Sequence, residues 1–449
     1  MKKFSLMLGA LLVAASASAE GYQVNTLSAR QLGMGHVGVA LKLGAESEHF
    51  NPAGMAFMDK TVDISAGVTA TSPFCTAETA DGTKWETNNK VSTPLYLYSA
   101  FRIYDNLKVG VSLNTPYGSS INWTNDWAGA MLSQRVKLQT FSLQPTVAWR
   151  ITDRIAVGAG LMIAWGSVDL DKGLVCGAST DLLLAAQGID YRFESITPAS
   201  VNLKGTAQVA FGYNVGVMVD VTKSLTIGAS FRSKLTAKVK AGDARVSYAN
   251  ELAEQILESK IGLINSANFK AEMPMPYVLT MGASYKLNSR LMMAFDAQLT
   301  GWKAYKELNI EFLNEKLAGF NQNLKKNYHN AWAFRLGAQY ALTNRLDLRA
   351  GIAYDRTPVD DNYYNPETPG KDKLSPSVGL SFRPIKNLSI DVACAYIASV
   401  GGGVKSYTYE DLILKQLAAM GMQVNPQQTF SARYNPIAWC PSIGIGYSF

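Results

Sequence analysis

A repeated unit organises most of this chain: an alternating stretch of about ten residues, a short polar turn, a second alternating stretch and a long irregular loop. Alternation with a period of two puts every second side chain on the same face of a strand. Because short and long connections also alternate, consecutive strands form hairpins that can close into a barrel. The six short turns lie at residues 104–106, 152–154, 222–224, 287–289, 343–345 and 384–387.

The turns set the expected number of strands. Six hairpins account for twelve strands, and one strand at each end of the array brings the number to fourteen. We therefore predict an all-β fold, a 14-stranded antiparallel transmembrane β-barrel, because an even number lets the first and last strands pair. The expected strands cover residues 61–71, 93–103, 107–117, 136–151, 155–168, 205–221, 225–240, 276–287, 290–303, 329–342, 345–356, 373–384, 388–400 and 434–449.

A membrane location follows from what these stretches contain. No run of eighteen apolar residues follows the first part of the chain, so any crossing must be made by strands. Charged residues make up only 17% of the chain, against about 25% in soluble proteins. The last strand alternates apolar residues with Ser and Gly and ends on Phe449, as outer-membrane barrels do. We expect a Gram-negative outer membrane, with short turns and both termini facing the periplasm.

The N-terminal region divides into two parts. Lys2 and Lys3 precede an apolar run and the small residues at 17–19, which predicts a signal peptide over residues 1–19. Residues 20–60 do not alternate and are rich in Gly. A barrel of this size has a lumen that is either plugged or open to water. We expect residues 20–60 to form a hatch (plug) inside the lumen and residues 61–449 to form the barrel with its long extracellular loops.

The four cysteines indicate neither a metal site nor a cofactor. They are Cys75, Cys176, Cys394 and Cys440, and no C-x-x-C pair occurs among them. Side-chain parity places Cys394 and Cys440 on strand faces that do not favour a bridge. Cys75 and Cys176 lie in long loops, where a disulfide stays an open alternative.

The sequence does not favour an enzyme or a nucleic-acid-binding protein. A hydrolase needs a nucleophile beside an activating base, yet His36 and His49 lie in the expected hatch and His329 at a strand edge, with no nucleophile motif nearby. The formal charge of +7 is too small and dispersed to indicate nucleic acid.

Two long loops carry helical patterns, at residues 181–187 and 248–264. Their apolar residues either pack the loops together or form a landing site for a hydrophobic ligand, and both alternatives stay open. The expected capture residues are Leu182, Leu183, Leu184, Leu252 and Ile256.

A series of motifs in the same order along the chain resembles the FadL/TodX-type outer-membrane transporters of long-chain fatty acids and aromatic hydrocarbons. The Asn-Pro-Ala element is the most specific of them. The motifs are Gly21-Tyr22-Gln23-Val24-Asn25, Ser28-Ala29-Arg30, Leu32-Gly33-Met34-Gly35, Phe50-Asn51-Pro52-Ala53-Gly54-Met55, Asn114-Thr115-Pro116-Tyr117-Gly118 with Trp123 and Trp127, Pro274-Met275-Pro276 with Gly282 and Tyr285, Asp296 with Trp302, Arg335-Leu336-Gly337 with Tyr340, and Tyr354-Asp355-Arg356-Thr357-Pro358.

The resemblance implies passive uptake in which loops catch a ligand, an interior pocket binds it and a kinked third strand releases it sideways. The kink is expected at Asn114, Thr115, Pro116, Tyr117 and Gly118, where a proline without an N–H adjoins a flexible glycine. The hatch and gating residues are expected to be Gly21, Tyr22, Gln23, Val24, Asn25, Asn51, Pro52, Ala53 and Gly54. Asn51 is expected to tie the hatch to the kink.

The expected ligand is a long-chain fatty acid, whose carboxylate needs a cation inside the barrel. Arg335 and Arg349 are the candidates for headgroup binding. Aromatic hydrocarbon uptake and a structural or adhesive outer-membrane barrel are the alternatives. We expect a monomer that contacts outer-membrane lipid and lipopolysaccharide and needs no cofactor.

Overall fold

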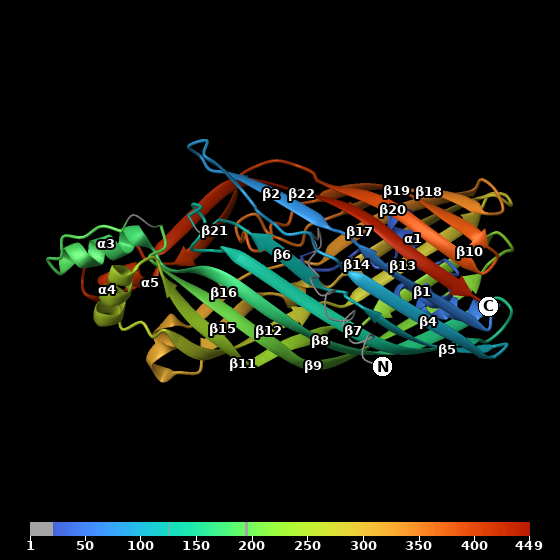
Figure 1. The fold of residues 1–449 in the computed structure, drawn as a ribbon, viewed down its shortest axis with the longest axis horizontal. Helices are drawn as coiled ribbons and strands as arrows, with labels where there is room; N and C mark the ends of the chain where they lie inside the picture. Colours follow the sequence, from blue (N-terminus) through green and yellow to red (C-terminus); the bar gives the residue numbers. More distant parts are fainter. Residues whose placement is uncertain (1–20, 125, 194–195) are drawn as a thin grey trace, which may run out of the picture.

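The computed structural model describes residues 21–124, 126–193 and 196–449, so the predicted signal peptide lies outside the described residues. Within them the wall is a closed antiparallel barrel of fourteen strands, which confirms the predicted fold (Figure 1). In the order in which they pair, the wall strands are β1 (Val62–Thr69), β4 (Leu95–Tyr104), β5 (Leu107–Asn114) continued by β6 (Gly118–Asn122), β7 (Arg135–Arg150), β8 (Ile155–Val175), β9 (Ala199–Asp220), β10 (Leu225–Arg232) continued by β11 (Leu235–Tyr248), β12 (Ser266–Met275) continued by β13 (Val278–Lys286), β14 (Leu291–Thr300), β17 (Ala331–Ala341), β18 (Leu346–Asp355), β19 (Lys373–Ile385), β20 (Leu388–Ser399) and β22 (Gln427–Ser448).

The first and last strands close the barrel. β1 pairs with β22 from Asp63 opposite Ser448 to Thr69 opposite Ser442, and pairs with β4 along its other edge. Along β22, Ile443 and Ile445 are more than half exposed on the outside while Ser442 is buried. The alternation read from the sequence is therefore the inside-outside alternation of the wall.

The two ends of the barrel differ, as the turn lengths predicted. The short turns and the C-terminus lie at one end, here named the turn end, and α3, α4 and α5 lie at the other, the loop end (Figure 1). The loops also contain short strands and an eight-residue helix, α5, that the sequence analysis did not predict, because segments this short carry little periodicity. The loop elements are β2 (Ser72–Glu78), β3 (Lys84–Glu86), α3 (Gly177–Ala186), α4 (Glu251–Ile261), η3 (Trp302–Ala304), β15 (Glu307–Phe312), η4 (Glu315–Phe320), β16 (Gln322–Lys325), β21 (Lys405–Glu410) and α5 (Leu412–Ala419).

Besides the first strand, which β2 continues along β22 after a gap at residues 70–71, three wall strands are interrupted. The third strand breaks at residues 115–117, the seventh at 233–234 and the eighth at 276–277. The sequence predicts a kink in the third strand, a continuous seventh strand and an eighth strand that begins at residue 276, so only the first of the three breaks was expected. Pro116 and Pro276 lack a backbone N–H, so neither can donate a ladder hydrogen bond at its break.

The N-terminal segment, residues 21–60, is almost entirely buried up to Met58. It contacts wall strands on opposite sides of the barrel, with α1 against β19, β20 and β22 and η2 against β7, β8 and β9. Side chains cap its short helices: the Ser28 hydroxyl accepts from Gln31 N, and the Asn51 amide oxygen accepts from Ala53 N. Its helices are α1 (Ala29–Leu32), η1 (Gly44–Glu46), α2 (Ser47–Phe50) and η2 (Pro52–Phe57).

The four cysteines are free thiols, so the Cys75–Cys176 disulfide that the sequence left open is absent. Cys75 is buried on β2, whereas Cys176 precedes α3 in the loops. Among the described residues, no helix is both long and apolar enough to cross a membrane.

Candidate functional site

The break in the third strand is filled from inside by the start of the N-terminal segment. Val24 N donates to Pro116 O at 2.9 Å, and Gly118 N donates to Tyr22 O at 2.8 Å. Gln23 faces Tyr117 in an antiparallel bridge. The N-terminal segment thus supplies a short strand partner at the point where the wall ladder stops.

The kinked strand leaves one neighbour and keeps the other. β5 pairs with β4 up to Asn114, but β6 makes no ladder with β4 in the part of the chain that the structure describes. On its other edge β6 stays paired with β7, and the Thr140 hydroxyl donates to Tyr117 O at 2.7 Å. A cavity of about 40 Å³ lies beside the break, between Gly21, Ser119 and Phe74 of β2, which is about one third exposed. The expected kink is therefore present, with a narrow cavity on the side that β4 no longer covers.

Tyr22 sits in a cluster of aromatic rings. Its ring centroid lies 4.7 Å from that of Trp302, 5.8 Å from Tyr305 and 6.2 Å from Tyr117, all edge to face. Tyr328 extends the cluster from Tyr305 at 5.2 Å. The start of the N-terminal segment is therefore held by a buried aromatic cluster on the loop side of the rest of the segment.

Two tyrosine hydroxyls connect this cluster to the break in the eighth strand. Tyr22 donates its hydroxyl to Pro274 O, and Tyr117 donates its hydroxyl to Pro276 O at 3.2 Å. The proline-rich break leaves carbonyl oxygens directed into the lumen, where the tyrosines reach them. One set of contacts thus joins the N-terminal segment, the third strand and the eighth strand.

Asn51 does not contact the kink, so that part of the prediction was wrong. Its side-chain amide donates to Val39 O at 2.7 Å and to Val217 O of β9 at 3.0 Å. Gly216 permits the contact, because a Cβ there would lie 2.0 Å from Asn51 Oδ1. A Cβ on Gly158 of β8 would lie 2.5 Å from the Pro52 carbonyl carbon and 2.7 Å from Ala53 N. The Asn-Pro-Ala element therefore fixes the segment to the fifth and sixth strands, and residues 22–24 contact the kink instead.

The two arginines expected to bind a headgroup are already neutralised. Arg335 is buried, donates to Gln298 at 2.9 Å and lies 3.4 Å from the Asp355 carboxylate. Arg349 lies 3.3 Å from Asp391 and 3.8 Å from Asp347. Asp355 lies on β18, the strand next to that of Arg335, whereas Asp347 lies on Arg349's own strand and Asp391 lies on β20, two strands away. Sequence position alone does not reveal the pairings with Asp355 and Asp391.

Two other cations are buried beside the aromatic cluster. Lys326 is fully buried, forms an ion pair with Glu367 and lies 5.9 Å from the Tyr305 ring centroid. Lys172, also buried, donates to Gln322 at 2.8 Å. Two lysines near one carboxylate leave an excess positive charge in an apolar setting. Neither lysine was predicted from the sequence, because no local pattern distinguishes them from exposed loop lysines.

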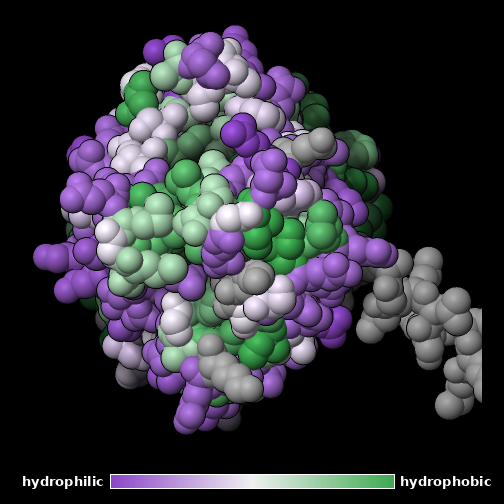
Figure 2. Space-filling model, turned by 90° about the vertical axis from the view of Figure 1, so that its left-hand side faces the viewer, coloured by the Kyte–Doolittle hydropathy of each residue, from purple (hydrophilic) through white to green (hydrophobic). Residues whose placement is uncertain are grey.

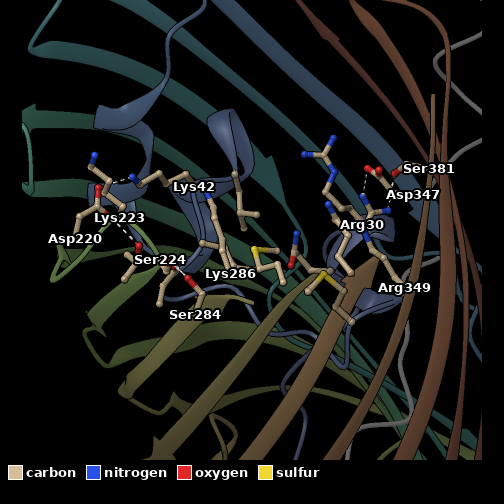
Figure 3. A pocket seen from close by; sticks show the side chains of 18 of the residues that line it. Arg30, Lys42, Asp220, Lys223, Ser224, Ser284, Lys286, Asp347, Arg349 and Ser381 are labelled. Carbon is tan, nitrogen blue, oxygen red and sulfur yellow. Dashed lines mark hydrogen bonds and ion pairs between the residues drawn. The ribbon is translucent and has the colours of Figure 1, made fainter. Parts of the chain in front are cut away.

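The turn end has a different chemistry. A cavity of about 580 Å³ lies there, between the N-terminal segment and the wall (Figure 3). Arg30 and Arg349 lie on one side of it near Asp347, and Lys42 donates to Asp220 at 2.6 Å on the other. Charged side chains on most sides make this cavity suitable for water and ions rather than for hydrocarbon.

The loop end exposes only part of the expected capture set. Leu182 on α3 and Leu252 on α4 are nearly half exposed, and Ile256 is partly buried. Leu183 and Leu184 are fully buried, so their predicted role in capture was wrong: α3 packs against α5, which the sequence analysis had not predicted. Figure 2 shows apolar residues gathered in patches among hydrophilic ones on this end of the molecule.

Comparisons with known proteins agree with the fold and the motifs. The model of a family described as outer membrane protein transport protein (OMPP1/FadL/TodX) matches residues 10–449. Outer membrane protein P1 of Haemophilus influenzae is 25% identical over 432 residues, covering 88% of this chain and 90% of that protein. The long-chain fatty acid transport protein of Escherichia coli O6:H1 is 24% identical over 438 residues, covering 91% and 95%. A crystal structure of a Pseudomonas aeruginosa FadL homologue superposes with a TM-score of 0.80 at 20% identity, covering 96% and 100%, and so shares the fold.

Proposed function

The chain belongs to the outer membrane protein transport protein family (OMPP1/FadL/TodX), and from this premise we propose that it takes up long-chain fatty acids through the side of its barrel. As a member of this family it is an outer-membrane protein that transports hydrophobic compounds, not an enzyme. The observation that carries the proposal is the pairing of residues 22–24 with residues 116–118, by which the start of the N-terminal segment bridges a break in the wall.

Capture begins at the loop end. The exposed Leu182 and Leu252, with the partly exposed Ile256, offer apolar surface to an acyl chain arriving from water. Each CH₂ group removed from water contributes about 0.8 kcal/mol. Several methylene groups therefore suffice to hold a ligand at the loops without a deep pocket.

The interior favours a carboxylate on the ligand. The aromatic cluster around Tyr22 and Tyr305 suits an acyl chain, and the nearby Lys172 and Lys326 supply more positive charge than Glu367 neutralises. A fatty acid would compensate the remaining charge, whereas a neutral hydrocarbon would not. We therefore assign headgroup binding to the two lysines rather than to Arg335 or Arg349.

Exit is sideways because the straight path is polar. Below the aromatic cluster, the N-terminal segment acts as a hatch and the charged cavity of the turn end follows. Passage through that cavity would expose the chain to water, at a cost of about 0.8 kcal/mol per CH₂. Ligand that displaces Tyr22 breaks the contacts of residues 22–24 with the kink and opens the cavity beside Phe74 toward the bilayer.

Uptake of radiolabelled oleate by cells carrying the protein tests this function. We compare the natural chain with Asn51→Ala and with a deletion of residues 21–25, and expect uptake to fall at least several-fold in both. Uptake by both variants at the rate of the natural chain would contradict the hatch mechanism. Uptake equal to that of cells without the protein would instead favour the structural or adhesive barrel.

The lysine variants identify the substrate class. Lys172→Met with Lys326→Met should weaken oleate uptake while leaving uptake of methyl oleate, which has no carboxylate, nearly unchanged. Equal loss for both ligands would show that the lysines are structural. Faster uptake of toluene than of oleate by the natural chain would favour the aromatic hydrocarbon alternative.

A further inference from the structure

The wall contains a second discontinuity, between the sixth strand (β9) and the seventh (β10 and β11). β10 pairs with β9 up to Arg232 opposite Asn214, and β11 resumes the ladder at Asp243 opposite Lys204. Among the described residues, 205–212 of β9 form no backbone pairs with 234–242 of the seventh strand, and we name these two stretches the seam. Eight residues of strand span roughly 26 Å. Both stretches are mostly paired on their far edges: β9 pairs with β8 except at residues 208–209, where the register shifts, and β11 pairs with β12 except at residues 240–241.

An unpaired seam is unusual in a barrel, because backbone N–H and C=O groups facing lipid normally all find partners. Here the seventh strand bows away from β9. It breaks at residues 233–234, and its register with β12 shifts between Val239 and Gly242. Two bonds between Ser233 and Tyr213, at 2.8 and 2.9 Å, mark the end of the seam nearer the turns.

Side chains fill the seam in place of hydrogen bonds. A Cβ on Gly212 would lie 2.6 Å from Leu235 Cδ2, and one on Gly205 would lie 2.6 Å from Val239 Cγ1. The two glycines thus make room for two aliphatic side chains of β11. Rotation of a side chain takes picoseconds to nanoseconds, whereas separation of a strand pair requires breaking its ladder. The seam can therefore part without breaking a ladder.

An apolar cavity lies directly behind the seam. It has a volume of about 70 Å³ and is lined mainly by aliphatic and aromatic side chains. Both edges of the seam contribute to it, through Leu203 and Ala207 of β9 and Ala237 and Val239 of β11. Phe269 of β12 closes its far side. A chain that passed between the strands would remain in apolar surroundings.

The outer face of the seam indicates what would approach it. Phe211 and Tyr213 are more than half exposed toward the turn end of the seam, as aromatic residues are at a membrane interface. Lys204 of β9 borders the seam on the loop side, and two further exposed lysines, Lys238 and Lys240, lie within the seam stretch of β11. Lys238 lies 2.9 Å from Glu272, but no ion pair occupies the other two within the described chain. Aromatic rings below and ammonium groups above match an amphiphile with an anionic headgroup.

We propose that the seam is a second lateral portal, through which an acyl chain of an anionic amphiphile in the outer leaflet enters the apolar cavity while its headgroup stays at Lys204 and Lys240. This inference rests on the proposed function and adds a route that begins in the bilayer instead of at the loops. β7, β8 and β9 separate the portal from the kink in the third strand. Ligand taken from the membrane and ligand released through the kink thus use different openings.

A probe confined to the bilayer tests the portal. The purified chain with Ala237→Cys is reconstituted in phosphatidylcholine vesicles that contain a phosphatidylglycerol bearing a maleimide on one acyl chain. Such a two-chain lipid does not leave the membrane for the loops, so it reaches residue 237 only between the strands. Mass spectrometry of the peptide carrying residue 237 measures labelling and distinguishes it from labelling of the natural cysteines.

The matched control is Ser230→Cys, which is buried inside the wall where β10 is paired on both edges, whereas Ala237 is partly buried beside the seam. We expect Ala237→Cys to label at least tenfold faster than Ser230→Cys, and oleate to slow the reaction. Equal labelling rates would overturn the portal. Oleate uptake is measured in the same variants. Uptake without selective labelling of Ala237→Cys would contradict the portal but not the transport proposal. Selective labelling without uptake would support the portal and contradict the transport proposal.

The lysines are tested with the same probe. Lys204→Glu with Lys240→Glu should slow labelling of Ala237→Cys by the anionic lipid several-fold and leave labelling by a phosphatidylcholine version unchanged. Lys223→Glu, an exposed lysine in a short turn, is the matched charge control. If Lys223→Glu slowed labelling as much as the double substitution at Lys204 and Lys240, the overall charge of the protein, and not the seam lysines, would attract the headgroup.

Discussion

Tyr22 shows how much of the site depends on one side chain. Its backbone carbonyl accepts from Gly118 N, its ring packs against Trp302, and its hydroxyl bonds to Pro274 O. These contacts belong to three different parts of the barrel. A ligand that competes for the ring also weakens the backbone pairing with the kink, which links occupancy of the interior to the state of the wall.

Graded substitution of Tyr22 should separate the hydroxyl from the ring. Tyr22→Phe removes a hydrogen bond, at about 1 kcal/mol, and Tyr22→Ala removes the ring as well, at about 4 kcal/mol. We expect hydrogen exchange of the Val24 and Gly118 amides to speed up roughly fivefold in the first variant and far more in the second. Identical exchange in both variants would show that the ring does not hold the pairing.

Two histidines should make the N-terminal segment sensitive to acid. Burial, with added repulsion from Arg335, holds the pKa of His36 well below its usual value. Burial and the nearby Arg232 do the same for His49, whose Nδ1 lies 3.2 Å from the guanidinium. The unfolded segment takes up protons near pH 6.5 and the packed segment does not. The contribution of these two histidines to packing stability is therefore complete above about pH 6.5 and is lost as the pH falls.

Hydrogen exchange measures this effect as protection factors for residues 29–57 between about pH 7.5 and about pH 5. We expect protection to fall toward acid in the segment while β18, in the wall, stays protected. Equal protection across the range in both places would show that the two imidazoles do not control the packing.

At the scale of elements, the interrupted strands matter more than the regular ones. The paired part of β9 holds the segment through Asn51. The break in the third strand pairs with the backbone of Tyr22 and Val24, and carbonyl oxygens at the break in the eighth strand accept from the hydroxyls of Tyr22 and Tyr117. Each break is short and flanked by paired strand. The wall therefore stays closed as a barrel, while the breaks in the third and eighth strands present backbone groups to the lumen.

Proline 116 should be necessary for the opening. Pro116→Val restores a backbone N–H and favours a continuous third strand. We expect the rate of oleate uptake to fall several-fold while oleate binding to the purified protein is unchanged. Pro145→Val on β7, where the proline lies within a ladder, is the control and should leave uptake unaltered. A normal rate in Pro116→Val would contradict sideways exit at the kink.

At the scale of the whole molecule, stability depends on the closing pair of strands. Phe449 O accepts from Thr61 N at 2.7 Å and from Val62 N at 2.9 Å, and Phe449 N donates to Val62 O at 3.0 Å. These bonds lie at the turn end of the β1–β22 ladder. The last residue thus completes the barrel through its backbone, although its ring is half exposed.

Deletion of Phe449 should lower the free energy of unfolding by about 3 kcal/mol, because three hydrogen bonds of about 1 kcal/mol each are lost. Phe449→Ala keeps the backbone and should cost much less. Urea unfolding of the protein in lipid vesicles, followed by tryptophan fluorescence, measures both. A similar loss in both variants would assign the effect to the ring.

The sequence by itself determined the barrel, its number of strands and the difference between its two ends. Alternation and turn residues act over a few positions, so they can be read locally, and Pro116 marked the kink for the same reason. Only the tertiary structure decided which side chains meet. Asn51 bonds to Val217, Tyr22 reaches Pro274 and Lys326 is buried beside Glu367 because closure of the barrel brings distant strands together. Local patterns carry no information about such contacts. For the same reason, the sequence did not reveal the seam between β9 and β11.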